Sequence, residues 1–215
     1  MKILALSDEV VDFIYSPQVK DRFGDVDLVL GCGDLPFYYL EFVVTMLNKP
    51  LYFVPGNHDV RALYMSDGRI LHHAEGCVNL DRRIAHEPDL ILAGLGGSIR
   101  YRPDGIHQYT DGEMRAHITS LIPRLWINRL CYGRFLDILI THSPPFGIHD
   151  GGDLAHRGFK SFINFVKNFR PRYLLHGHSH VYRRTEVTRT QLGETEILNV
   201  YPYRVIEWET AAANG

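Results

Sequence analysis

Six short apolar runs recur along the chain, and each ends in Gly, Pro or polar residues. They occupy residues 2–8, 27–34, 51–59, 89–97, 137–145 and 173–180. A continuous apolar run of about five residues that breaks at a turn is typical of a buried strand in an α/β sheet. The pattern therefore predicts six buried strands whose carboxyl ends carry the polar residues.

Helical periodicity fills several of the intervals between these runs. It predicts helices over 36–47 and 158–169, the second with buried phenylalanines on one face. Thr110 and Glu113 have the spacing of a capping box and predict a helix running toward residue 132. The last third is β-rich, with strands expected over 181–188, 195–202 and 203–209 and a hairpin turn in QLGET, residues 191–195. The chain is thus expected to be an α/β protein with an antiparallel final portion.

The composition fits one globular domain over residues 1–215. The chain is 45% hydrophobic and 22% charged, with a formal net charge of -2, so no global charge favours nucleic acid or an anionic membrane. No run approaches the roughly 20 apolar residues of a spanning helix, and the apolar run at the start is too short for a signal peptide. Three scattered cysteines do not predict a disulfide framework. These features predict a soluble cytoplasmic protein without a membrane or nucleic-acid partner.

Polar residues that can bind metal follow five of the six predicted strands. In α/β sheets the binding crevice lies beyond the carboxyl ends of the strands, so such residues are candidates for one shared site. Carboxylate oxygens, an amide oxygen and imidazole nitrogens without a thiolate favour manganese, iron, zinc or a similar divalent ion. The candidates are Asp8, Asp34, Asn57, His58, Asp59, His142, His178 and His180.

The segment YLLHGHSHVY places three histidines, His176, His178 and His180, at every second position. If the strand continued through them, all three side chains would lie on one face. Gly177 would let the backbone approach another group closely.

Four motifs in order along the chain resemble the calcineurin-like metallophosphoesterases: GD at 33–34, GNHD at 56–59, THSPP at 141–145 and GHSH at 177–180. The resemblance implies a four-layer α/β/β/α sandwich of two mixed β-sheets with a two-metal site at the strand ends. It implies that Asp34 bridges two metals, that Asn57, His142 and His178 bind one of them, and that Asp8 and His180 bind the other. It further implies that His58 is the catalytic histidine and that Asp59 orients it. His176 receives no role from the resemblance and is interpreted as structural.

This ligand set is suited to the hydrolysis of a small phosphomonoester or phosphodiester. Two cations about 3.5 to 4 Å apart activate a bridging hydroxide and neutralise charge on the phosphoryl oxygens. A histidine next to the ligand Asn57 can give a proton to the leaving oxygen near neutral pH.

One position departs from the family pattern. The family's first motif is normally Asp-x-His, and here it reads Asp8-Glu9-Val10, so one ligand is absent. Asp12 or a histidine between 149 and 156 could fill the gap, whereas Glu9 is expected to face away. The departure leaves two alternatives open: an inactive scaffold for protein interaction, similar to the retromer subunit of this architecture, and a nuclease.

The long loops 94–111 and 146–158 are the expected substrate-determining segments. Arg100, Arg102, His149 and Arg157 in them are candidates for holding a phosphate oxygen or a polar leaving group, and each is equally interpretable as a solvated loop residue.

Overall fold

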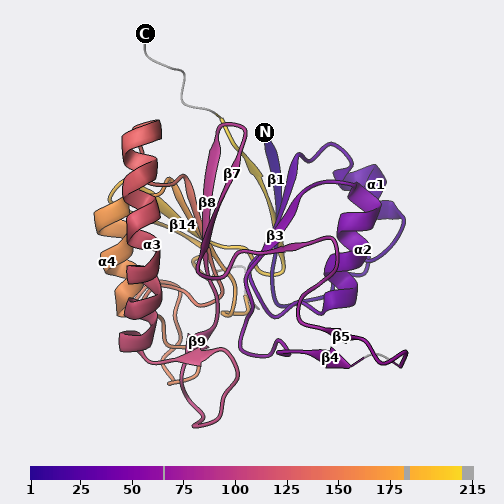
Figure 1. Cartoon of the computed structure of the whole chain (residues 1–215), viewed down its shortest axis with the longest axis horizontal. Helices are drawn as coiled ribbons and strands as arrows, with labels where there is room; N and C mark the ends of the chain where they lie inside the picture. Colours follow the sequence, from indigo (N-terminus) through magenta and orange to yellow (C-terminus); the bar gives the residue numbers. More distant parts are fainter. Residues whose placement is uncertain (65, 182–184, 210–215) are drawn as a thin grey trace.

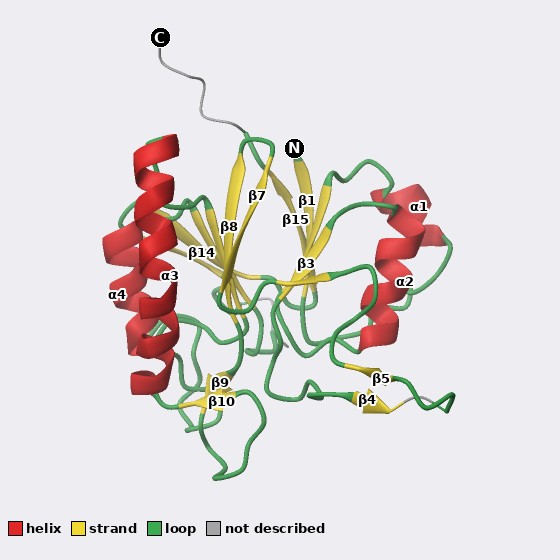
Figure 2. Ribbon diagram, viewed as in Figure 1, coloured by secondary structure: helices red, strands yellow, loops and turns green. Residues whose placement is uncertain are grey.

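Two large mixed sheets face each other at the centre of the molecule (Figures 1 and 2). The computed structural model describes residues 1–64, 66–181 and 185–209. The first sheet has the strand order β15-β1-β2-β3-β6, and the second has the order β13-β14-β12-β11-β8-β7. Helices α1 and α2 cover the outside of the first sheet, and α3 and α4 cover the outside of the second. The expected four-layer α/β/β/α sandwich is confirmed.

The strand bounds match the apolar runs closely. The first sheet contains β1 (Lys2–Leu6), β2 (Leu28–Gly31), β3 (Leu51–Phe53), β6 (Val78–Asn79) and β15 (Tyr203–Glu207). The second contains β7 (Arg83–Glu87), β8 (Leu90–Leu95), β11 (Ile138–Thr141), β12 (Tyr173–His176), β13 (Arg189–Leu192) and β14 (Thr195–Asn199). Two small pairs, β4 (Leu63–Tyr64) with β5 (Ile70–Leu71) and β9 (Ser98–Ile99) with β10 (Gln108–Tyr109), complete the strands in the described part of the chain.

Alternation along the strands builds three hydrophobic layers. In β1, Ile3 and Ala5 face the second sheet, while Leu4 and Leu6 face the helices. Both sets are fully buried because β1 is covered on both faces. This double burial explains why the runs are continuously apolar.

The helices are α1 (Gln18–Phe23), α2 (Phe37–Leu47), α3 (Asp111–Tyr132) and α4 (Lys160–Phe169). The predicted capping box is present at α3, where the Thr110 side chain and Glu113 bond each other's backbone N–H groups. The predicted phenylalanines Phe159, Phe162 and Phe169 are buried against the second sheet, and so is Phe165, which the pattern did not single out.

The structure differs from the predicted elements at three points. Residues 181 and 185–188 are not in a strand, and the hairpin pairs Arg189–Leu192 with Thr195–Asn199 instead; residues 182–184 of that expected strand lie outside the described residues. The β7–β8 hairpin was not predicted, because the β7 sequence RIAHE lacks a continuous apolar run. Strand β12 ends at His176, so it does not continue through His178 and His180.

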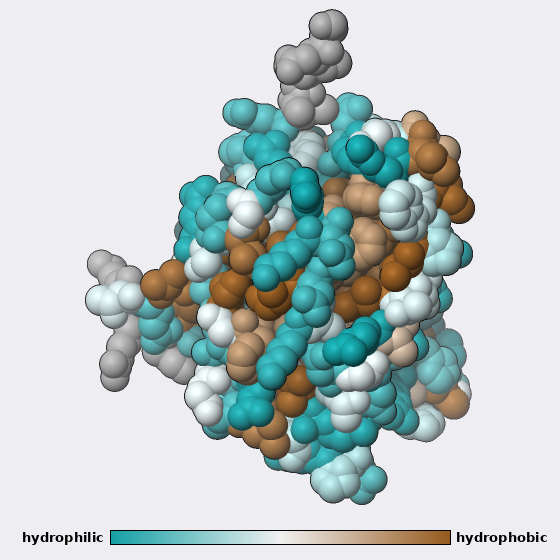
Figure 3. Space-filling model, turned by 90° about the vertical axis from the view of Figure 1, so that its left-hand side faces the viewer, coloured by the Kyte–Doolittle hydropathy of each residue, from teal (hydrophilic) through white to brown (hydrophobic). Residues whose placement is uncertain are grey.

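The outer helical face of α3 and α4 carries interspersed hydrophilic and hydrophobic side chains (Figure 3). Trp126, Ile127 and Leu130 are exposed, while Leu121 and Leu125 of the same helix are buried in the core. No helix among the described residues has both the length and the apolar character needed to cross a bilayer.

Candidate metal centre

The site residues follow strands that run in parallel and end at the same edge, the lower edge of the sheets in Figure 2. Parallel strands bring their carboxyl ends together, so residues far apart in the sequence become neighbours there. β1 is followed by Asp8, β2 by Asp34, β3 by residues 57–59, β11 by His142, and β12 by His178 and His180.

The backbone turns sharply at three of these residues. Asp8, Asp34 and His178 have φ values of 64°, 54° and 66°, the left-handed region that is uncommon for residues other than glycine. Such conformations cluster at functional sites, where the surrounding structure enforces them. The turn at His178 is the physical reason why the histidines of this segment do not share one strand face.

Residue 177 must be a glycine because its backbone lies very close to Ser7 and Asp8, and not because of its φ angle. A Cβ atom at this position would overlap Ser7 Oγ and Asp8 Oδ2. The missing side chain lets the backbone N–H of His178 donate to the Asp8 carboxylate, at 2.9 Å from Oδ2. Gly177 therefore joins the end of β12 to the end of β1, as its expected role requires.

His142 lies at the centre of the cluster and is fully buried. Its Nδ1 atom lies 2.9 Å from the carbonyl oxygen of Cys32, and because a carbonyl only accepts, Nδ1 carries the ring proton. Its Nε2 atom lies 3.0 Å from Asn57 Oδ1, 3.1 Å from His178 Nδ1 and 3.4 Å from Asp34 Oδ2.

The neighbours of His142 Nε2 also present lone pairs. His178 Nε2 lies 2.7 Å from the carbonyl oxygen of Ala155 and donates to it, so Nδ1 of the neutral ring is an acceptor. Asn57 Nδ2 lies 3.2 Å from the Tyr101 hydroxyl oxygen, which turns Oδ1 toward His142. Four acceptors so close together repel one another unless a proton or a cation lies among them. The donor set fits a divalent transition metal ion.

The acid–base properties of the cluster agree with this geometry. Burial lowers the pKa of His142, but the negative charge of Asp34 and the hydrogen bond to it outweigh burial and raise that pKa to about 10. Burial, together with the charge of His142, lowers the pKa of His178 to about 4. Burial raises the pKa of Asp34, yet the charge and hydrogen bond of His142 bring it well below its usual range. A proton on His142 thus holds the position that a cation would take.

Asp8 and His180 form the other side of the cluster. The Asp8 carboxylate is buried and accepts a hydrogen bond from the Ser7 hydroxyl. His180 Nε2 lies 3.7 Å from Asp8 Oδ1, and the His180 ring stacks on Tyr201 with centroids 4.7 Å apart. Ligand atoms of Asp8, Asp34 and His142 all lie within 4.8 Å of one another, so Asp34 is close to both groups.

His58 is exposed next to this cluster. Its backbone N–H donates to Asp34 Oδ1 at 2.8 Å, and its side chain lines a cavity of about 370 Å³ together with Asp34 and Tyr38. Asp59 Oδ2 accepts the backbone N–H groups of Asp34 and Gly56, at 2.9 and 2.7 Å. Asp59 thereby ties the two loops together, a contact that the sequence did not predict; its effect on His58 stays a prediction.

None of Glu9, Val10 and Asp12 has a side-chain hydrogen bond or ion pair with a candidate ligand among the contacts of the described residues. Val10 is half-buried and packs on the hydrophobic layer under α1 and α2, Glu9 accepts a hydrogen bond from the Tyr201 hydroxyl, and Asp12 is exposed. The His156 ring lies 5.4 Å from that of His178, between ring centroids, and its Nδ1 pairs with Asp153.

His176 lies in a buried hydrogen-bonded chain that the sequence did not reveal. His176 Nδ1 donates to the carbonyl oxygen of Gly177 at 2.9 Å, so its Nε2 accepts from His149 Nδ1, also at 2.9 Å. Thr190 Oγ1 then donates to His149 Nε2 at 2.9 Å. Every ring nitrogen in this chain is satisfied, which agrees with a structural role for His176.

A family model described as calcineurin-like phosphoesterase matches residues 1–182, which include every candidate ligand. The chain belongs to this family. The resemblance read from the four motifs is therefore confirmed, and the candidate metal centre lies where this calcineurin-like phosphoesterase has its motifs.

Proteins that are similar to this chain align with nearly its whole length. An uncharacterized protein of Methanocaldococcus jannaschii is 22% identical over 222 residues, which cover 98% of this chain and 92% of the relative. The crystal structure of TT1561 of Thermus thermophilus superposes with a TM-score of 0.61 at 15% identity, covering 93% of this chain and 88% of that one. A Vps29 single mutant from Entamoeba histolytica gives a TM-score of 0.43 at 14% identity, covering 93% and 73%.

Proposed function

We propose that this calcineurin-like phosphoesterase hydrolyses a small phosphomonoester or phosphodiester in a reaction that depends on two divalent metal ions. The observation that carries the proposal is the convergence of acceptors on the buried Nε2 atom of His142, 3.0 to 3.4 Å away. A protein gains little from burying such a set unless a cation satisfies it.

The chain offers ligands for two ions. Asp34, Asn57, His142 and His178 would hold one, and Asp8, Asp34 and His180 would hold the other, with Asp34 common to both. Oxygen and imidazole donors without a thiolate favour manganese or iron, with zinc also accommodated. Bound there, two divalent ions supply Lewis acidity for the phosphoryl oxygens and lower the pKa of water.

The residues around the ligands position them and move the proton. The Cys32 and Ala155 carbonyls fix the ring orientations of His142 and His178, and partners of this kind commonly change metal affinity or activity by about 10- to 100-fold. His58 is exposed beside Asp34, where its imidazole can donate a proton to the leaving oxygen. Asp59 holds the Asp34 turn against the Asn57 turn.

The three free thiols fit a reducing compartment, and we place the reaction in the cytoplasm.

The experiment is an assay of nitrophenyl monoesters and diesters with chelated protein, before and after addition of Mn²⁺. We expect hydrolysis only after metal is added, and loss of that hydrolysis in Asp34→Asn, because the shared carboxylate is removed. Arg69→Gln is the control, since Arg69 is exposed and pairs with Asp67 away from the cluster. Full activity after exhaustive chelation would overturn the proposal, and a metal-free, inactive protein would favour the scaffold interpretation.

A further inference from the structure

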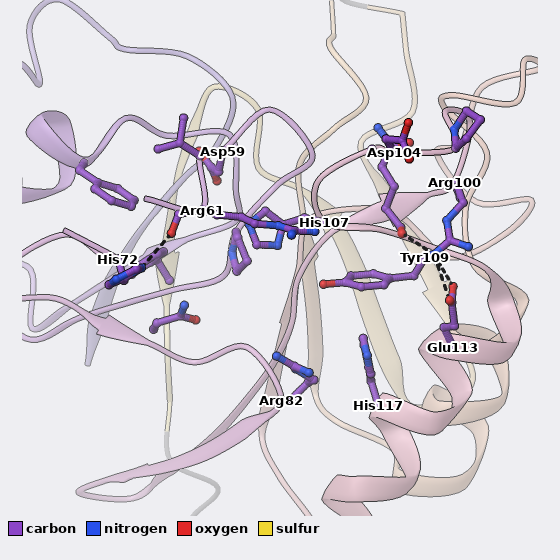
Figure 4. Close-up of a pocket in the computed structure, with 18 residues that line it drawn as sticks. Asp59, Arg61, His72, Arg82, Arg100, Asp104, His107, Tyr109, Glu113 and His117 are labelled. Carbon is purple, nitrogen blue, oxygen red and sulfur yellow. Dashed lines mark hydrogen bonds and ion pairs between the residues drawn. The ribbon is translucent and has the colours of Figure 1, made fainter. Parts of the chain in front are cut away.

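A second and larger cavity adjoins the metal centre and is lined by basic side chains (Figure 4). Its volume is about 700 Å³. We call it the arginine pocket and define it by Arg61, Arg82, Arg100, His107, Tyr109 and His117. These residues come from three separate parts of the chain, so the pocket cannot be predicted from a local sequence motif.

The three arginines keep N–H donors that form no hydrogen bond or ion pair with the described residues. Arg61 forms no ion pair with any residue in the described ranges, and Arg82 uses only Nε, 3.1 Å from Asp81 Oδ2. Arg100 is engaged through one terminal nitrogen with Glu113 and the Gln108 carbonyl oxygen. A guanidinium carries five N–H donors in a fork that matches phosphate and carboxylate oxygens.

Two of the three carboxylates that line the pocket already accept hydrogen bonds from protein groups. Asp59 accepts two backbone N–H groups at the metal centre, and Glu113 completes the cap of α3 while pairing with Arg100. Asp104, on the exposed 100–109 loop, is the remaining lining carboxylate. The unused N–H donors of Arg61 and Arg82 are therefore more numerous than the unused carboxylate oxygens of the pocket wall.

A buried nitrogen in the wall also lacks a partner. His117 Nδ1 has no hydrogen bond with the described residues, and the His117 ring packs edge-on against Tyr109 with centroids 4.6 Å apart. Figure 4 shows His117 on α3 and Arg82 below Tyr109, with Arg61 and His107 above it. A buried polar nitrogen without a partner destabilises a fold unless a ligand or water satisfies it.

The pocket shares part of its wall with the cavity beside the metal centre. Asp59 lines the arginine pocket and also the smaller cavity that contains His58 and Asp34. The 100–109 loop, which forms one wall, carries the Tyr101 hydroxyl that bonds Asn57. A ligand in the pocket would therefore lie on the Asn57 and Asp59 side of the metal cluster.

We propose that the arginine pocket binds a second phosphate group of the substrate while the metal centre acts on the first, so that the preferred substrates are small bisphosphorylated esters. This inference rests on the proposed phosphoesterase function for its account of turnover. The binding of phosphate by the pocket itself can be measured without turnover.

The first test compares the kcat/KM of the metal-loaded enzyme for glucose 1,6-bisphosphate with that for glucose 1-phosphate. We expect a ratio above about 10, because a hydrogen-bonded charge pair contributes at least about that factor. The ratio should fall about tenfold in Arg61→Gln and stay at the parent value in Arg69→Gln. Equal kcat/KM values for the two esters in the parent would overturn the substrate assignment.

The second test titrates inorganic phosphate into Asp34→Asn protein in the presence of a chelator, where the metal centre cannot hold the anion. We expect one phosphate per chain, with a Kd that rises about tenfold when Arg61→Gln is added and is unchanged when Arg69→Gln is added. Absence of binding, or equal binding in both double variants, would overturn the pocket. If no ester is hydrolysed, the proposed function fails and this titration alone decides the pocket.

Discussion

Replacement of His142 by alanine should remove one metal ion while leaving the other ligands in place. The imidazole is fully buried and lies within 3.4 Å of Asp34, Asn57 and His178, so no exposed side chain can substitute for it. Loss of a direct ligand should weaken binding of that ion at least about 100-fold, since even outer partners change affinity by about 10- to 100-fold.

The loss of metal affinity corresponds to a smaller metal-dependent gain in the free energy of unfolding. At a free metal concentration about 100 times the parent Kd, binding stabilises the folded state by about 2.7 kcal/mol. A Kd raised about 100-fold reduces that gain to about 0.4 kcal/mol at the same concentration. For a chain of this size about 1 kcal/mol changes Tm by about 2 to 4 °C. The second ion contributes equally to both proteins, so the metal-dependent rise in Tm should be about 5 to 9 °C smaller in His142→Ala than in the parent.

The assay is thermal unfolding of each protein with and without metal, so that each variant is its own reference. His142→Ala also leaves the Cys32 carbonyl without its donor, which lowers the Tm of the metal-free form but does not enter the metal-dependent difference. His58→Asn is the matched control, because His58 belongs to the same edge and is expected to keep the full gain. An equal metal-dependent rise in His142→Ala and the parent would refute the assignment of His142 as a ligand.

Three further predictions follow from the same geometry. His58→Asn should cut turnover by about 10² to 10⁴ with metal content unchanged, as general acid catalysis contributes about that factor; metal analysis and steady-state rates check it. Val10→His should move the weaker of two metal-binding steps to at least about tenfold lower concentration; an unchanged step, with two ions per parent chain, would show that the site is complete without position 10. Burial lowers the pKa of His176 to about 3 and that of His149 to about 4, so both rings are neutral in the fold. Their stabilisation is complete above the unfolded pKa of about 6.5 and is lost as pH falls, at about 1.4 kcal/mol per pH unit for the buried His176; urea unfolding at pH 7 and 5 should show a smaller loss in His149→Asn than in the parent.

The sequence predicts that the residues at the strand ends come together, and Asp8, Asp34 and His142 do so in the structure. Asp8, Asp34 and His142 each follow a continuous apolar run, and buried parallel strands bring such ends to one edge whatever the details of the helices. The four motifs identify the family because their residue types and order are restrictive.

Contacts made by the backbone and by distant loops could not be read from the sequence. The turn at His178 depends on the overlap that Gly177 avoids, and the ring orientation of His178 depends on the Ala155 carbonyl, which has no side-chain signature. Tyr101 reaches Asn57 across 44 residues of sequence. The β7–β8 hairpin was missed because the alternation of β7 is weak, and pairing with β8 stabilises it.

The central claim is that the strand-end cluster holds two divalent ions with Asp34 between them. Anomalous diffraction from crystals soaked in Mn²⁺ tests it most directly. We predict two peaks, one among Asn57, His142 and His178 and the other beside Asp8 and His180, both within coordination distance of Asp34. A cluster without anomalous density at saturating Mn²⁺, or a single peak away from His142, would contradict the account.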